Sequence, residues 1–114
     1  MLVRNITRGT DVADRACLAD DFRSRLVGLL GRSSLEPGEA LVLESCRSIH
    51  TAFMRFSIDA VYIDRRGEVV KLVAALKPFR VSGVLRGAAS VIELPSGTIA
   101  RTNTALGDQL SIES

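Results

Sequence analysis

The sequence has no tryptophan, a single histidine, two cysteines and few aromatic residues of any kind. Aromatic residues make up 4% of the 114 residues, too few to provide successive stacking platforms for nucleotide bases. Lysine and arginine exceed aspartate and glutamate by only two, so no strong positive field would attract a polyanion. We therefore expect no nucleic-acid partner.

Long apolar runs and a leader pattern are also missing. No apolar stretch approaches the roughly 20 residues that a membrane-spanning helix needs. The first residues, MLVRNI, lack the basic start and apolar core of an export signal. Cys17 and Cys46 do not suggest a disulfide-stabilised secreted protein, so free thiols and a cytoplasmic location are expected.

The composition that is present is typical of a globular protein. Hydrophobic residues make up 46% and charged residues 25%, which argues against disorder. A chain of this length is close to the commonest domain size and can bury one core. We expect a single domain over 1–114.

The pattern of apolar residues predicts six or seven short strands and one main helix. The helix, at about 21–30, has its apolar residues at helical spacing and Gly31 after its last turn. Asp64–Gly67 joins two β-branched runs and predicts a hairpin. A short helical turn is expected within 96–104. The expected strands are 2–6, 12–18, 40–46, 58–63, 68–76, 90–94 and 109–112. This order indicates an α+β fold, mostly β, with a curled or partly closed barrel-like sheet.

The window from Cys46 to Met54 gathers the reactive side chains, because it also holds His50. Cysteine, histidine and methionine are ligands of copper(I), and cysteine with histidine also suits zinc. On a strand, however, residues four apart are separated by roughly 13 Å, too far to share one ion. A metal site would need a sharp turn or ligands from elsewhere, so we assign no metal and no cofactor.

A thiol enzyme is a second interpretation of the same window. Cys46 as nucleophile, His50 as base and Asp59 as orienting acid would suit a hydrolase. No local signature of a thiol enzyme surrounds Cys46. The alternative is that Cys46 and Met54 fill the core and His50 is a hydrogen-bonded histidine at the rim of the sheet.

Two carboxylates fall on strand positions where burial is expected. Asp59 shares a face with Val61 and Ile63, and Glu93 falls on the Val91 face of its strand. A buried carboxylate must be paired or lie at the open end of a strand, because burying it bare is costly. For Asp59 a structural salt bridge and a ligand contact are both open, with candidate partners Arg25, Arg47 and Arg55.

Six segments together resemble an uncharacterised prokaryotic family, domain of unknown function 192. The segment at 25–32, RLVGLLGR, is similar to its Arg-x-x-Gly-Leu-Met-x-Arg motif, and 58–69 is similar to its Ile-Asp-x-x-Phe-x-Asp hairpin. The remaining matches follow in family order at 49–54, Pro78, 91–97 and 107–108. Phe56 and Ser57 stand where many members have asparagine and proline, so no role of that asparagine carries over.

The resemblance implies a compact, mostly β domain with a short helix and no established activity. It points to family positions without giving them chemistry: Arg25, Gly28, Met54, Asp59, Glu93, Gly97 and Asp108. We interpret Gly28, Gly97, Gly107 and Asp108 as structural. Asp108 is expected to bond its own backbone in a turn before the last strand.

The sequence therefore predicts a small binding module for a small molecule or a peptide segment. Its cleft would be lined by His50, Met54 and Asp59, with Arg25 or Arg55 supplying positive charge and Glu93 a further polar group. The Cys/His-dependent hydrolase and a soft-metal carrier for copper or zinc are the alternatives.

Overall fold

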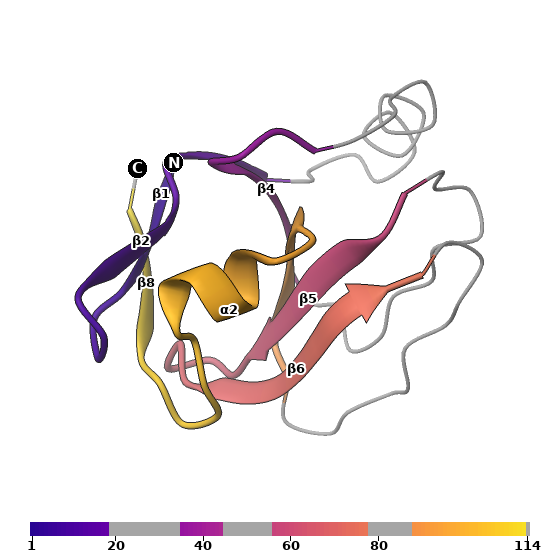
Figure 1. The fold of residues 1–114 in the computed structure, drawn as a ribbon. Helices are drawn as coiled ribbons and strands as arrows, with labels where there is room; N and C mark the ends of the chain where they lie inside the picture. Colours follow the sequence, from indigo (N-terminus) through magenta and orange to yellow (C-terminus); the bar gives the residue numbers. More distant parts are fainter. Residues whose placement is uncertain (19–34, 45–55, 78–87, 114) are drawn as a thin grey trace.

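A computed structural model describes residues 1–18, 35–44, 56–77 and 88–113, and in these ranges the chain is built mainly of strands (Figure 1). The predicted helix at about 21–30 lies outside the described residues. The elements in chain order are β1 (Leu2–Asn5), β2 (Thr10–Ala13), β3 (Arg15–Leu18), β4 (Glu39–Glu44), β5 (Ile58–Ile63), β6 (Val69–Leu76), β7 (Ser90–Pro95), α2 (Thr98–Thr102) and β8 (Leu110–Glu113).

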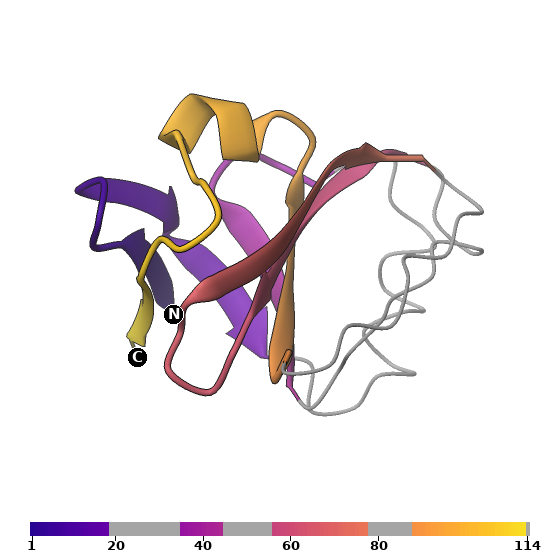
Figure 2. The same ribbon diagram turned by 90° about the horizontal axis from the view of Figure 1, so that it is seen from below.

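A five-stranded sheet forms the larger layer, in the order β3-β4-β7-β5-β6. Strands β3 and β4 are parallel, whereas the other neighbours in this sheet are antiparallel. The sheet is strongly twisted and does not close into a barrel (Figure 2). This confirms the predicted α+β, mostly β class with a curled sheet.

A smaller three-stranded sheet, in the order β2-β1-β8, brings the two ends of the chain together (Figure 1). Leu2 of β1 pairs with Glu113 of β8 in an antiparallel ladder. The prediction of one strand over 12–18 was wrong, because the chain leaves one sheet for the other at Asp14. β2 belongs to the small sheet and β3 to the large one.

The hairpin predicted at Asp64–Gly67 is confirmed between β5 and β6. Gly67 has a φ of 84°, a conformation that residues with a Cβ rarely adopt. A Cβ at this position would also lie 2.5 Å from the Leu110 carbonyl oxygen. Asp64 Oδ1 accepts hydrogen bonds from the main-chain N–H groups of Arg66 and Glu68, which fixes the turn.

The central strands of the five-stranded sheet, β5 and β7, are buried on both faces. Along β7, Ile92 and Leu94 join the apolar cluster between the two sheets, which also contains Val3 and Leu110. Val91 points the other way, into a second cluster with Leu35, Leu41, Leu43, Ile58, Ala60, Tyr62 and Ala88. A side chain on β5 or in the middle of β7 is therefore surrounded by apolar groups whichever face it takes.

The short helix α2 confirms the helical turn predicted within 96–104. It follows β7 directly, and its Ile99 packs against the cluster between the sheets. Within the described ranges, no helix has the length and apolar character that crossing a membrane requires.

Candidate functional site

Glu93 lies in the middle of the five-stranded sheet, on its central strand β7. Its cross-strand neighbours are Leu41 on β4 and Ala60 on β5, and these side chains share a face with it. Glu93 is 4% exposed, and its Oε2 receives no hydrogen bond from any of the described residues. Burial raises the pKa of Glu93 to about 7, because the charged form loses its hydration.

Tyr62 lies on the same face, two residues beyond Ala60 along β5. It pairs with Val91 of β7, two residues from Glu93, and is completely buried. Lys71 of β6 is opposite Tyr62 in the ladder, and its Nζ is 5.2 Å from the ring centroid. We call the face that carries Tyr62, Lys71 and Glu93 the Glu93 face. It combines a carboxyl group, a phenol and an ammonium on otherwise apolar surroundings.

Asp59 lies on the opposite face of the same sheet. It pairs with Leu94, which belongs to the cluster between the sheets, so the predicted register with Val61 and Ile63 is confirmed. The carboxylate is 1% exposed and accepts three main-chain N–H groups. Oδ1 bonds Ala75 N at 2.8 Å, and Oδ2 bonds Gly97 N at 3.1 Å and Ile99 N at 2.9 Å.

These bonds give Asp59 a definite role in the fold. Gly97 at the start of α2 has no side chain to cap the helix, so a carboxylate from β5 accepts the free N–H groups and compensates the positive helix end. Ala75 has a φ of 51°, where β6 departs from regular pairing with β5. Asp59 thus connects β5 to the end of β6, through Ala75, and to α2, through Gly97 and Ile99.

The structure does not bring the two described site candidates together, because Asp59 and Glu93 occupy opposite faces of one sheet. The other candidates, Arg25, His50, Met54 and Arg55, lie outside the described residues, as does Cys46. Cys17 on β3 is an exposed free thiol. Among the described residues, no group of three or more histidine, cysteine or acidic side chains could hold a metal ion.

The raised pKa of Glu93 predicts how stability depends on pH. The unfolded chain releases this proton near pH 4.5, whereas the folded chain keeps it until about pH 7. The folded state therefore binds more protons between these values, and stability falls as the pH rises through them. This difference in pKa between the folded and the unfolded chain corresponds to roughly 3 kcal/mol of unfolding free energy.

We expect the unfolding free energy of the wild type, relative to Glu93→Gln, to fall by roughly 3 kcal/mol between pH 4.5 and 8. Urea titrations of both proteins at several pH values measure this. The glutamine keeps the shape and does not titrate, so curves that stay parallel would show that Glu93 ionises freely in the folded protein.

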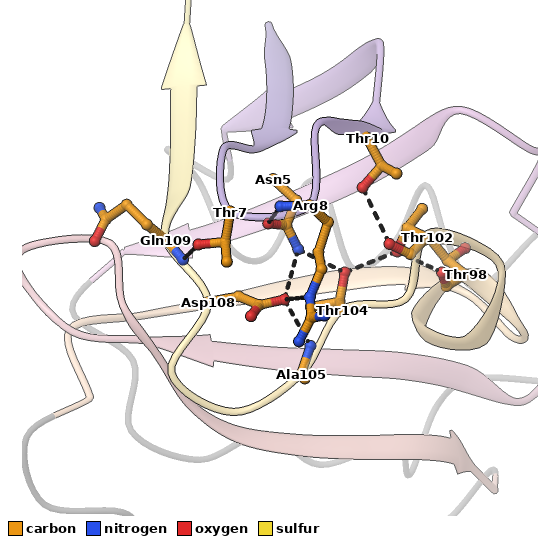
Figure 3. Close-up of polar contacts among 10 residues, drawn as sticks. All are labelled: Asn5, Thr7, Arg8, Thr10, Thr98, Thr102, Thr104, Ala105, Asp108 and Gln109. Carbon is orange, nitrogen blue, oxygen red and sulfur yellow. Dashed lines mark hydrogen bonds and ion pairs between the residues drawn. The ribbon is translucent and has the colours of Figure 1, made fainter.

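A second buried polar cluster connects the ends of the chain (Figure 3). Asp108, 2% exposed, accepts at Oδ2 from Asn5 Nδ2 at 3.0 Å, Arg8 Nε at 3.1 Å and Ala105 N at 2.9 Å. Asn5 also donates to Thr104 Oγ1, and its Oδ1 accepts from Arg8 N. We call Asn5, Arg8, Thr104 and Asp108 the terminal cluster.

The electrostatics of the terminal cluster differ from those of Glu93. Desolvation acts to raise the pKa of Asp108, but the hydrogen bonds from Asn5, Arg8 and Ala105 and the Arg8 charge outweigh it and lower the pKa below its ordinary value. The three donors at Oδ2 come from β1, from the turn after it and from the loop before β8. We interpret the terminal cluster as structural, joining β1 to the loop before β8, whereas Glu93 Oε2 is a buried oxygen that no described residue bonds.

Asp108 bonds nearby main chain, as predicted, but not in an Asx-type turn. It accepts from Ala105 N, three residues before it, whereas the N–H two residues on, that of Leu110, donates to Gly67 O. Sequence reasoning missed Asn5 and Arg8. Asn5 is two residues from Val3 on β1, so the two side chains share the buried face of the strand. That spacing was the available signal for a buried polar side chain. Arg8, in the turn that follows, carried no such signal.

Comparison with known proteins places the chain in a family. The family model DUF192, described as Uncharacterized ACR, COG1430, matches residues 3–112. The chain belongs to DUF192. Its curated relatives include a UPF0127 protein of Pyrococcus furiosus, 34% identical over 93% of both chains. Another, from Thermococcus sibiricus, is 34% identical over 96% of this chain and 73% of its own length.

Two crystal structures resemble this DUF192 protein along nearly its whole length. A protein of unknown function from Novosphingobium aromaticivorans has a TM-score of 0.79 and 19% identity, covering 97% of this chain and 82% of its own. A proposed transcription regulator from Sinorhizobium meliloti has a TM-score of 0.76 and 25% identity, covering 96% and 91%. The family is uncharacterised, and the curated relatives named here are archaeal.

Proposed function

We propose that this DUF192 protein is a small binding module and that its ligand site lies on the Glu93 face. The observation that carries the proposal is the Glu93 carboxyl group, which is buried and has one oxygen that no described residue bonds. A buried polar atom without a partner costs free energy unless something binds it. A ligand that presents an N–H or O–H group would remove that cost.

The chemistry of the face describes the ligand further. Apolar side chains around Glu93 and the Tyr62 ring suit an apolar body, and the carboxylate suits a donor group such as an ammonium or an amide. His50, Met54, Arg25 and Arg55 stay in the proposal as residues that complete the site, the arginines facing an anionic part of the ligand. A small molecule or a peptide segment would meet this description. Asp59 is not included, because its carboxylate holds α2.

The test uses n-butylamine, N-acetyl-leucine methylamide and leucine amide as probes, because each joins a donor to an apolar body. Binding is measured by ligand-observed NMR for the wild type and for Glu93→Gln. We expect a probe to bind the wild type and to bind Glu93→Gln at least about tenfold more weakly, the effect of losing one hydrogen bond to a charged group.

Glu113→Gln is the matched control, since Glu113 is an exposed glutamate on β8, in the three-stranded sheet. It should leave the affinity unchanged. Equal affinity in Glu93→Gln, or no binding by any probe, would refute the proposal.

The enzyme alternative is favoured by the same raised pKa of Glu93, since a carboxyl group that titrates near neutrality suits acid–base catalysis. The thiol and the imidazole that such an enzyme would use, those of Cys46 and His50, lie outside the described residues. Met54, the third ligand considered for a soft-metal carrier, lies outside them as well. Labelling of Cys46 by a mild alkylating agent at neutral pH, lost in His50→Ala, would support a Cys/His-dependent hydrolase.

Our proposal includes a cytoplasmic location, supported by the free thiol of Cys17. It includes no nucleic-acid partner, although the Sinorhizobium meliloti protein is described as a proposed transcription regulator. A formal net charge of +2 is small for binding a polyanion.

A further inference from the structure

A hollow of about 380 Å³ opens between β8 and the hairpin that joins β5 to β6. The hairpin and β8 lie side by side, because Leu110 N donates to Gly67 O and Glu68 forms a bridge with Gln109. The floor is apolar and includes Ile63, Leu110 and Ile112. Ile112 is 38% exposed, one of the few large apolar side chains that the described residues leave open to solvent.

The mouth of the hollow carries uncompensated positive charge. Arg65 and Arg66 line it and are exposed, and none of the ion pairs between described residues includes either guanidinium. Asp64 is the one lining carboxylate, and its Oδ1 accepts from main-chain N–H groups of the turn. Two guanidinium groups and one carboxylate leave an excess of one positive charge.

The edge of β8 offers main-chain groups next to this charge. Leu110 N points away from β1, towards Gly67, whereas Gln109 O accepts from Ile6 N on the β1 side. Because direction alternates along an antiparallel strand, Ile112 directs its N–H and C=O groups away from β1, as Leu110 does. No described residue bonds these two groups, since the hairpin runs beside β8 only from Gly67 onward and the turn residues before Gly67 do not continue the pairing.

We propose that this hollow and the edge of β8 bind an extended, acidic polypeptide segment by strand addition. The segment would pair with the main chain of Ile112, place an apolar side chain against Ile63 and Ile112, and direct carboxylates to Arg65 and Arg66. Strand addition takes its affinity from main-chain hydrogen bonds and its selectivity from neighbouring pockets. A small amphipathic anion would use the charge and the floor but not both main-chain groups of Ile112.

This site is independent of the proposed function. The hollow opens beside the cluster between the two sheets, to which Ile63 and Leu110 belong, whereas Glu93 faces the opposite side of the five-stranded sheet. Either proposal can fail without the other.

The probe is a fluorescein-labelled seven-residue peptide that alternates glutamate and valine, followed by fluorescence anisotropy. We expect Arg65→Glu/Arg66→Glu to weaken its binding at least about tenfold by reversing the charge at the mouth. Ile112→Ser should weaken it about fivefold by removing an apolar contact. The matched controls are Arg101→Glu, an exposed arginine on α2, and Ile6→Ser, an apolar residue that is 57% exposed; both should bind like the wild type.

Two altered peptides separate the contributions. Lysine in place of glutamate should abolish binding, and N-methylation of the central valines should weaken it by at least about tenfold through lost main-chain hydrogen bonds. The proposal would be overturned if the N-methylated peptide bound as tightly as the unmodified one, or if Arg65→Glu/Arg66→Glu bound the peptide as tightly as the wild type.

Two further results would identify another occupant. Displacement of the peptide by millimolar octanoate, with an unchanged affinity for the N-methylated form, would identify a small anion. Peptide-independent dimerisation that Ile112→Ser abolishes would identify a second copy, and either result overturns strand addition.

Discussion

Replacing Asp108 by alanine should lower the free energy of unfolding by about 4 kcal/mol, because it leaves several buried or partly buried donors without an acceptor. Oδ2 alone accepts from Asn5, Arg8 and Ala105. These donors come from β1, from the turn after it and from the loop before β8, so one carboxylate connects segments a hundred residues apart. Urea denaturation followed by circular dichroism measures the loss.

The control for this prediction is Asp11→Ala. Asp11 forms an ion pair with Arg4 at 3.7 Å, and both side chains are more than half exposed. Exposed pairs contribute about 0–1 kcal/mol, so Asp11→Ala should change stability little. Similar losses in the two variants would show that the terminal cluster is no more than a surface ion pair.

The loss of stability in Asp108→Ala should depend on pH, because the pKa of Asp108 is lowered in the folded protein. A carboxyl group with a lowered folded-state pKa stabilises the protein above its unfolded value, 3.8 here, and this contribution is lost as the pH falls through the folded value. The difference between wild type and Asp108→Ala should therefore be full at neutral pH and shrink below pH 4. Glu93 acts in the opposite sense, lowering stability between pH 4.5 and 7.

Local patterns in the sequence predicted the parts of the fold that local forces determine. The Asp64–Gly67 turn was predictable because it needs a residue that accepts positive φ, and the faces of Asp59 and Glu93 follow from the two-residue period of a strand. The break at Asp14 was not, because neither glycine nor proline marks it. It depends on β3 pairing in parallel with β4, across a long connection.

The partners of the buried carboxylates were harder to predict than their burial. Asp59 was expected to meet an arginine or a ligand, and its observed partners are main-chain N–H groups of residues 75, 97 and 99. Every residue but proline carries such a donor, so no side-chain pattern in the sequence marks the ones that will be used. Glu93 shows the reverse: its register predicted burial, and only the structure shows that the described residues leave one oxygen without a bond.

Asp59→Ala is the other substitution with a large expected effect, again about 4 kcal/mol of unfolding free energy. It removes a buried acceptor that three main-chain N–H groups share, and it leaves a cavity where the carboxylate was. Amide hydrogen exchange provides the specific readout. The N–H groups of Ala75, Gly97 and Ile99 should exchange faster in the variant than other amides of β5 and β7, because α2 and the end of β6 lose their anchor.

Asp64→Ala is the matched control, since Asp64 also accepts main-chain N–H groups, those of Arg66 and Glu68. Its turn is exposed, so water can replace the lost acceptor and the expected cost is about 1 kcal/mol. The contrast between the two aspartates compares hydrogen bonds to a buried acceptor with hydrogen bonds to an acceptor in an exposed turn. A loss in Asp59→Ala no larger than in Asp64→Ala, with unchanged exchange at Gly97 and Ile99, would mean that α2 is held by apolar packing. Asp59 would then be available for contact with a ligand.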